Sequence, residues 1–284
     1  WVSRVQVSSH VRERLYATFS GYRDDDMSAY VYHSEDLGKT WQSIASNLPA
    51  EPVNVIKEDP VNADVLYVGT NRGVYVSLDR GKEWQALPEG LPNVPVHDLV
   101  VHPRDRELVA GTHGRSVWIV DVLPIQELTS AVRSSAAHLF HVADVDYSRG
   151  WRQAPDRWFD HLDVKAKSVI HYWAAQAGSG TLSILDADNN PVRELKVDAK
   201  RGINRVEYDL LVDEKLGLAA EAARVAKANA KPDDKATTPS NEGELAKTPL
   251  AESKRLGHPL YLTPGDYNLS LNLGGAVAET KFTV

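Results

Sequence analysis

The side chains best suited to chemistry are charged residues in the first half of this 284-residue chain. Hydrolysis of a glycosidic bond uses two carboxylates that flank the scissile bond, roughly 5 to 9.5 Å apart. An anionic sugar is also held by arginines, because a guanidinium pairs with a carboxylate through two parallel hydrogen bonds. No spacing in the sequence pairs two carboxylates in this way, so we assign no catalytic residue. The candidates for such polar contacts are Arg23, Asp24, Asp25, Asp26, Arg72, Asp98 and Arg115.

Metal binding is the second chemistry that these residue types could support. The run Asp24–Asp26 supplies the oxygen atoms that calcium prefers, but the Gly and Glu of an EF-hand loop do not follow it. The chain has no cysteine and no His-Glu-x-x-His motif, and His10, His33 and His97 are isolated. We therefore expect an exposed acidic turn at Asp24–Asp26, no metal site and no cofactor.

The segment 113–116, His-Gly-Arg-Ser, is the most distinctive local motif. Its charged side chains could face a channel and hold an anionic ligand. The alternative is a tight turn between two strands, with the glycine at positive φ, and the segment 71–73, Asn-Arg-Gly, in a matching position favours this alternative. The candidate ligand-binding residues from these turns and the neighbouring strand are His113, Arg115, Arg72 and Asp98.

A repeat organises the elements that would position these residues. Two stretches share Ser-x-Asp-x-Gly-Lys-x-Trp, with their aspartates 43 residues apart, and this period is typical of repeats that each form one supersecondary unit. Around the second motif the alternation predicts four strands, at 53–58, 65–70, 73–78 and 83–87. Four short strands per copy indicate a β-propeller blade. The motif residues, which we expect to stabilise the turn between the third and fourth strands, are Ser34, Asp36, Gly38, Trp41, Ser77, Asp79, Gly81 and Trp84.

The third copy of the repeat is shorter than the second. Its third strand is expected at 116–121, and neither an Asp turn nor a fourth strand follows before Pro124. A propeller needs at least four blades to leave only protected edges. We therefore expect residues 1–124 to be the C-terminal blades of a propeller. We also expect the chain, which starts at Trp1 without methionine, to be a fragment or processed product.

The second half of the chain has a different composition and predicts a second domain. We expect a connector at 125–165 and an Ig-like antiparallel β-sandwich at 166–284, because about seven short alternating segments occur there. An insertion at 214–257 interrupts the sandwich. Its alanine-rich part, 214–231, predicts a helix. Its polar part, 232–257, has few aromatic residues and predicts a disordered, solvated loop, with a docking tail as the alternative.

The repeat residues resemble the Asp-box, or bacterial neuraminidase (BNR), repeat of sialidases, xyloglucanase-type hydrolases and sortilin-type propellers. The first domain further resembles secreted bacterial BNR-repeat or sortilin-like "glycosyl hydrolase" proteins, and the tail resembles the hook-capping type of Ig-like module. The resemblance implies Asp boxes on outer turns, away from the central channel, and a secreted, periplasmic or cell-envelope location. It rests on segments 19–23, 30–32, 47–49, 96–99, 111–116, 181–186, 202–205 and 264–267.

Composition excludes other classes of function. The net charge of −7 disfavours a nucleic-acid-binding surface, and no apolar run approaches the roughly 20 residues of a membrane span. The expected fold class is all-β: a partial propeller of about three four-stranded blades, then the sandwich with its helical and disordered insertion. We predict a non-catalytic binding or scaffold fragment for glycan or protein ligands, whose first partner is the missing N-terminal propeller portion. The alternative is part of a glycoside hydrolase with its catalytic residues mostly upstream.

Overall fold

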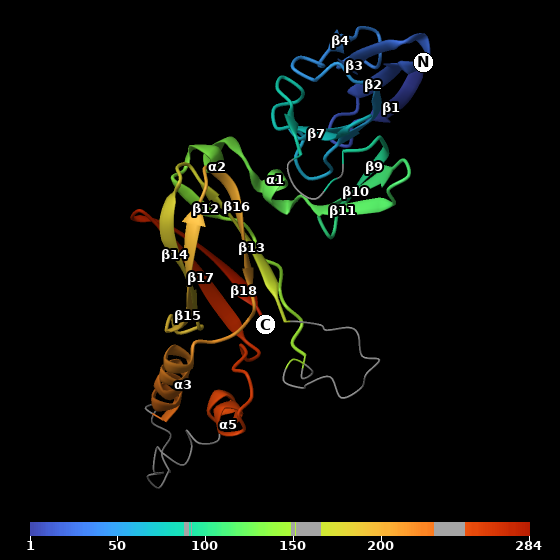
Figure 1. Cartoon of the computed structure of the whole chain (residues 1–284). Helices are drawn as coiled ribbons and strands as arrows, with labels where there is room; N and C mark the ends of the chain where they lie inside the picture. Colours follow the sequence, from blue (N-terminus) through green and yellow to red (C-terminus); the bar gives the residue numbers. More distant parts are fainter. Residues whose placement is uncertain (88–90, 92, 149–150, 152–165, 230–247) are drawn as a thin grey trace. The chain divides into compact units, whose positions relative to one another are not determined.

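The computed structural model describes residues 1–87, 91, 93–148, 151, 166–229 and 248–284. The chain divides into two compact units, residues 1–128 and 129–284 (Figure 1). Both units are built mainly from antiparallel β-sheets, so the predicted all-β fold class is confirmed. None of the helices in the described part of the chain has the length and apolar content needed to cross a bilayer.

The first unit contains three successive antiparallel sheets, each formed by strands in chain order. The first sheet consists of β1 (Val2–Val7), β2 (Leu15–Gly21), β3 (Asp26–Ser34) and β4 (Gln42–Ser43), with the 3-10 turn η1 (Tyr22–Asp24). The second consists of β5 (Val53–Glu58), β6 (Leu66–Thr70), β7 (Gly73–Ser77) and β8 (Gln85–Ala86). The third consists of β9 (Val96–His102), β10 (Glu107–Thr112) and β11 (Val117–Asp121). These are two four-stranded blades and a three-stranded one.

Strand register makes the first two sheets equivalent residue by residue. Val5 pairs with Ala17 as Ile56 pairs with Val68, which gives an offset of 51 residues in the first two strands. Leu15 pairs with Ser34 as Leu66 pairs with Ser77, so the third strand has an offset of 43 residues. This correspondence allows a residue in one sheet to be compared with its counterpart in the other.

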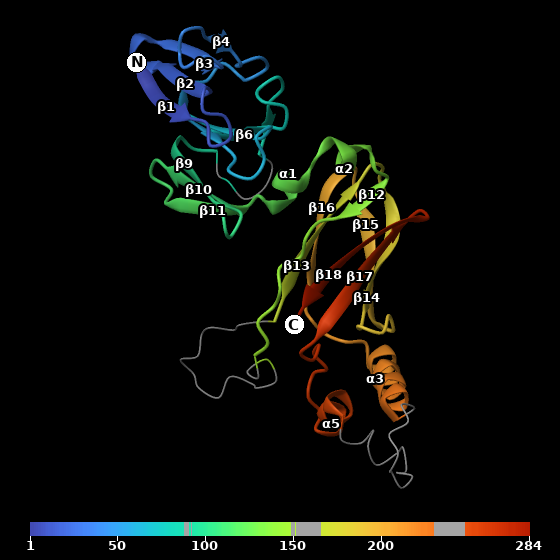
Figure 2. The same cartoon turned by 180° about the vertical axis from the view of Figure 1, so that it is seen from behind.

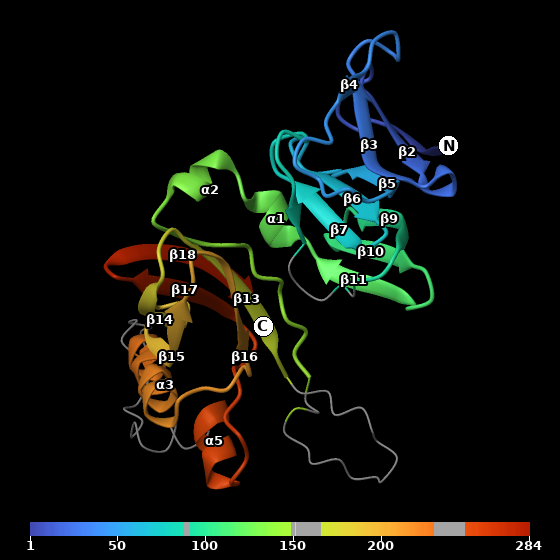
Figure 3. The ribbon, with the colours of Figure 1, turned by 45° about the horizontal axis from the view of Figure 1, so that its top comes forward.

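Apolar cores lie between consecutive sheets, which follow one another face to face (Figure 3). The core between the first and second sheets contains Tyr16, Val31, Ile44, Val53, Ile56, Leu66, Val68 and Trp84. The core between the second and third sheets contains Val55, Val65, Tyr67, Val74, Val76, Leu87, Val96, Leu99, Val101, Leu108, Ala110 and Val122. The second sheet is therefore buried on both faces, and burial of this apolar area supplies the main driving force for stacking.

A short helix, α1 (Leu123–Glu127), follows the third sheet directly. Pro124 occupies its first turn, where a missing backbone N–H costs nothing. Arg106 holds this helix, since its guanidinium donates to Gln126 Oε1 and to Glu127 Oε1, both at 2.7 Å. These contacts explain why the first unit extends to residue 128.

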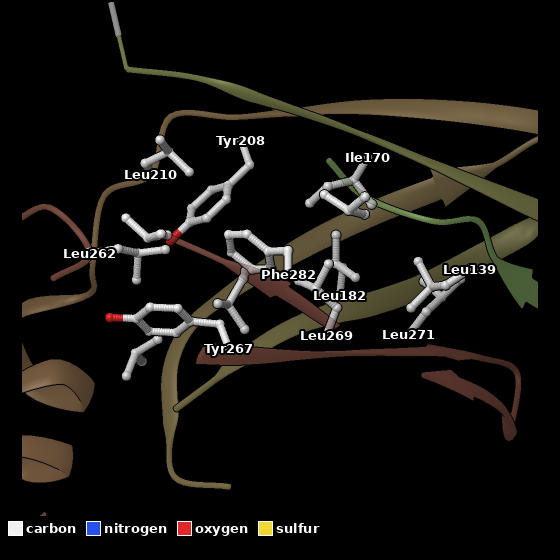
Figure 4. Close-up of a cluster of buried hydrophobic side chains, with 14 of the residues drawn as sticks. Leu139, Ile170, Leu182, Tyr208, Leu210, Leu262, Tyr267, Leu269, Leu271 and Phe282 are labelled. Atoms are coloured by element: carbon white, nitrogen blue, oxygen red, sulfur yellow. The ribbon is translucent and has the colours of Figure 1, made fainter. Parts of the chain in front are cut away.

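The second unit is a sandwich of two antiparallel sheets seen in Figures 1 and 2. After helix α2 (Ser130–Ser134), one sheet has the order β12 (Ala137–Leu139), β13 (Ser168–Ala174), β16 (Gly202–Tyr208). The other has the order β15 (Pro191–Ala199), β14 (Gly178–Leu185), β17 (Asp266–Leu273), β18 (Ala276–Thr283). The segment expected as a connector thus supplies strand β12. Inward-facing residues that include Ile170, Leu182, Tyr208 and Leu269 fill the core (Figure 4).

Two helices of the insertion pack at one end of the sandwich: α3 (Glu214–Asn229) and α5 (Pro249–Arg255). The expectation of a disordered, solvated loop over residues 232–257 is wrong for α5; residues 230–247 lie outside the described part. A long-range contact orders α5, because the buried Glu221 of α3 accepts hydrogen bonds from the backbone N–H groups of Leu250 and Ala251 at 3.0 and 3.3 Å. Leu250 is itself buried in the sandwich core.

Truncation of a core side chain should test the sandwich packing. We expect Leu182→Ala, at a fully buried position, to lower the free energy of unfolding by about 2–5 kcal/mol through lost burial and the cavity left behind. Val277→Ala, at an exposed position of β18, is the control and should change it little. Urea denaturation of both variants gives the measurement, and equal effects would contradict this core.

Candidate functional site

The turn of the first Ser-x-Asp-x-Gly motif is closed by hydrogen bonds among its own residues. The Ser34 hydroxyl donates to Asp36 Oδ1 at 2.8 Å and accepts from the Gly38 N–H at 2.8 Å. Asp36 also accepts from the Thr40 N–H at 2.9 Å and from the Thr40 hydroxyl at 2.7 Å. Leu37 and Gly38 both have positive φ, 61° and 85°. Because glycine adopts this conformation without a steric cost, it suits the second of these positions.

The second turn repeats this arrangement. The Ser77 hydroxyl donates to Asp79 Oδ1 at 2.8 Å and accepts from the Gly81 N–H at 2.7 Å, and Asp79 accepts from the Glu83 N–H at 3.0 Å. Arg80 and Gly81 have φ values of 59° and 85°. In both turns the aspartate carboxylate is occupied by hydrogen bonds within its own turn, which is an arrangement suited to stabilising a turn.

The carboxyl group of Asp36, the aspartate of the first turn, has a pKa well below its usual value. Hydrogen bonds from the Thr40 hydroxyl, the Thr40 N–H and the Ser34 hydroxyl stabilise the charged form and lower the pKa of Asp36 to about 2. A carboxyl group with this pKa is ionised at neutral pH and cannot serve there as a general acid.

The tryptophans that end the two motifs have different partners. The Trp84 indole N–H donates to the Ile44 carbonyl of the preceding sheet at 2.7 Å. Asn47 then fixes the Trp84 backbone, donating to its carbonyl at 2.9 Å and accepting from its N–H at 2.8 Å. The Trp41 indole N–H donates instead to Gly38 in its own turn at 3.0 Å. Trp84 is therefore an anchor between two sheets.

Among the candidate ligand-binding residues, Arg72 and Asp98 both lie near residues of opposite charge. Arg72, in the β6–β7 turn, has an exposed side chain whose Nε lies 3.9 Å from Glu51 Oε1. Glu51 is buried and accepts from the Thr70 hydroxyl at 2.8 Å. Asp98, in β9, accepts a hydrogen bond from Arg4 of β1 at 2.7 Å. Asp98 is therefore engaged by an arginine from another sheet.

His113 and Arg115 occupy the β10–β11 turn, and both are exposed. The His113 ring lies 5.5 Å, centroid to centroid, from the ring of His97 in β9. Gly114 has φ of 78°, and the Arg115 carbonyl accepts the indole N–H of Trp118 at 2.7 Å. The turn therefore has the glycine conformation that the turn interpretation predicted, and it presents imidazole and guanidinium groups to solvent.

These residues lie in or beside the turns that follow the second strands of the second and third sheets, β6 and β10. The β6–β7 and β10–β11 turns are equivalent in the repeat, and Asp98 pairs in register with Gly111, close to the second turn. Sequence reasoning missed Arg4 and Glu51, and its description of His97 as isolated is wrong, since the His97 ring lies beside that of His113. Arg4 had a detectable signal, since it is charged where its counterpart in the second sheet, Val55, is apolar and buried. The exposed imidazole and guanidinium groups of these turns have N–H groups that can donate hydrogen bonds to a polar ligand.

The acidic run Asp24–Asp26 forms the turn between β2 and β3. Asp26 accepts from the Tyr30 hydroxyl at 2.6 Å and from the Ser28 N–H at 2.9 Å. In the described ranges no group of three or more His, Cys, Asp or Glu side chains is arranged to hold a metal ion.

Two further carboxylates, Glu58 and Asp59, are buried between the sheets and were not anticipated from the sequence. Glu58 accepts from the Tyr16 hydroxyl at 2.9 Å, and Asp59 accepts from the Tyr67 hydroxyl at 3.1 Å and from Gln126 at 2.9 Å. Burial, with the adjacent carboxylates, raises the pKa of both tyrosines well above the usual range. These buried groups are therefore hydrogen-bonded, and Glu58 links the first and second sheets while Asp59 links the second sheet to α1.

No protein-family model matches the chain, and none of the curated proteins matches it. Among solved structures, it is similar to PorZ, a surface component of the type-IX secretion system of Porphyromonas gingivalis, at 10% identity and a TM-score of 0.34, over 100% of this chain and 30% of that one. It is similar to a GH74 xyloglucanase from Xanthomonas campestris at 13% identity and a TM-score of 0.35, over 99% of this chain and 38% of that one. It is also similar to a GH74 enzyme from Niastella koreensis, at 12% identity and a TM-score of 0.33, over 69% of this chain and 30% of that one. The chain thus spans 30–38% of the length of these solved chains.

Removal of the turn hydroxyl should reveal its contribution to stability. Ser77→Ala deletes a buried group that both donates and accepts, so we expect a loss of about 1–3 kcal/mol in the free energy of unfolding. The control Ser43→Ala, at an exposed position in β4, should have a smaller effect. Thermal and urea denaturation measure both, and an unchanged Ser77→Ala protein would contradict the role of this hydroxyl.

The low pKa of Asp36 predicts an acid-dependent stability. Because its folded pKa of about 2 is below the unfolded value of about 3.9, the carboxylate stabilises the fold above about pH 4. This contribution is lost as the pH falls through about 2. We expect the free energy of unfolding to fall more between these two pH values in the unaltered chain than in Asp36→Asn. Urea titrations over this pH range measure the difference, and parallel curves would contradict it.

Proposed function

We propose that the first unit is part of a larger Asp-box propeller of the secreted bacterial BNR-repeat type, followed by an Ig-like module of the hook-capping type. The repeated turn supports this proposal most strongly. Two segments 43 residues apart close with the same Ser–Asp–Gly hydrogen bonds and the same pair of positive-φ residues. Two such turns on successive sheets mark tandem copies of one unit.

In this proposal the chain binds or displays ligands and does not catalyse a reaction. The Asp-box carboxylates accept hydrogen bonds from residues of their own turns, and Asp98 is paired with Arg4. Neither arrangement provides the two facing carboxylates that a glycosidase requires. The ligands that suit the exposed groups at His113, Arg115 and Arg72 are extracytoplasmic glycans or proteins with anionic or hydroxyl-rich surfaces, since guanidinium groups recognise both.

Ligand binding at these turns can be tested on glycan and protein arrays, followed by titration of the ligands that bind. We expect Arg115→Ala to weaken binding by about tenfold, the loss that follows from removing a charge-assisted hydrogen bond. Arg104→Ala is a matched control, because Arg104 is an exposed arginine of the same sheet in the opposite turn, paired with Asp105.

Equal affinities for both variants would contradict the proposed surface. Release of sugar products by the full-length polypeptide, abolished by replacing carboxylates outside this chain, would instead support the glycoside hydrolase alternative.

A further inference from the structure

The first sheet has an apolar face that no described residue covers. The residues on this face line a wide cavity of about 630 Å³ that is open to solvent. Val2, Val5 and Trp41 on this face are 54%, 60% and 41% exposed. The residues that line the cavity are Val2, Val5, Ala17, Phe19, Tyr30, Tyr32 and Trp41.

The counterparts of these residues in the second sheet are buried. By the register offsets, Val2 and Val5 correspond to Val53 and Ile56, which are fully buried against the first sheet. Trp41 corresponds to Trp84, which is only 5% exposed. The same face of the repeat therefore packs on a preceding sheet in one copy and lies open in the other.

The interface between the first and second sheets has two specific contacts that the open face of the first sheet lacks. The Trp84 indole reaches the Ile44 carbonyl, whereas the Trp41 indole turns back to its own Gly38. A Cβ atom at Gly81 would lie 2.8 Å from Ile44, so this position must be glycine for the sheets to approach. A Cβ atom at Gly38 would meet nothing nearer than 3.5 Å. Gly38 thus has the small size needed for a close approach that is not made within this chain.

We propose that this face of the first sheet is the docking surface for a further Asp-box blade, carried ahead of residue 1 in the same polypeptide, with Trp41 as its anchor. The inference rests on the proposed function only in treating the sheets as propeller blades. It continues an interface already present twice in this unit, in which each sheet packs on the one before it.

The interface between the first and second sheets also predicts which residues the incoming blade presents to the first sheet. The first sheet offers the second an aromatic residue, Tyr16, from its second strand and Val31 from its third. Ile44, just after the fourth strand, supplies the carbonyl that accepts the tryptophan indole, and Asn47 fixes the tryptophan backbone. We expect the incoming blade to carry counterparts of these four residues, and Trp41 to donate to its main-chain carbonyl when docked.

Cysteine labelling can test this surface, because the chain contains no natural cysteine. Val5→Cys reports on the open face, and Ile56→Cys is the matched control at the equivalent buried position; Val53→Cys replaces the control if it fails to fold. In residues 1–284 alone, a maleimide should modify Val5→Cys at least about tenfold faster than the control. In the longer natural polypeptide, both cysteines should be protected to the same degree.

Three results would overturn the proposal. Fast labelling of Val5→Cys in the longer polypeptide, or a gene whose reading frame starts at residue 1, would exclude a preceding blade on this face. Concentration-dependent protection in residues 1–284, together with protection of Ile119→Cys on the exposed face of the third sheet, would assign the surface to a second copy. Ligand binding by the Arg115 variant is measured separately, so the proposed ligand-binding role and this docking surface can fail independently.

Discussion

The fold of the first unit depends on one kind of contact, in which the second and the third β-sheets each pack an apolar face on the sheet that precedes them in the chain. The strands are short, and β4 and β8 each contain only two residues. Sheets of this size bury little area by themselves, so stacking has to supply the stabilisation. The second Ser-x-Asp-x-Gly turn contributes to this contact, because Trp84 follows it and donates to the Ile44 carbonyl of the preceding sheet.

Polar groups between the sheets complement that apolar contact. Glu58 and Asp59 are buried, and each accepts hydrogen bonds from a tyrosine hydroxyl and from other donors. A buried carboxylate without such donors would be strongly destabilising. Arg72 and Arg115 lie in exposed turns, where they do not disturb the stacking. The proposed recognition surface thus uses a part of each repeat that the stacking does not.

Local patterns were sufficient to predict most strands but not the contacts that modify them. The expected strand at 53–58 matches β5, whereas the one at 83–87 is reduced to β8, since Asn47 takes both backbone groups of Trp84. Helix α5 forms in a segment predicted to be disordered because Glu221, on another helix, holds its first turn. The charge of Arg4 at a position where the second sheet has Val55 marks it as unusual, but nothing local identifies its partner Asp98, 94 residues away. Of the candidate site, the turns could be predicted and the charge partners could not.

The direction of the stacking has a consequence for synthesis on the ribosome. The indole of Trp84 is satisfied by Ile44 of the sheet made before it, and not by the sheet made after it. A sheet that leaves the ribosomal exit tunnel can therefore pack at once on the sheet that was synthesised before it. The order of translation is then also the order in which the sheets assemble.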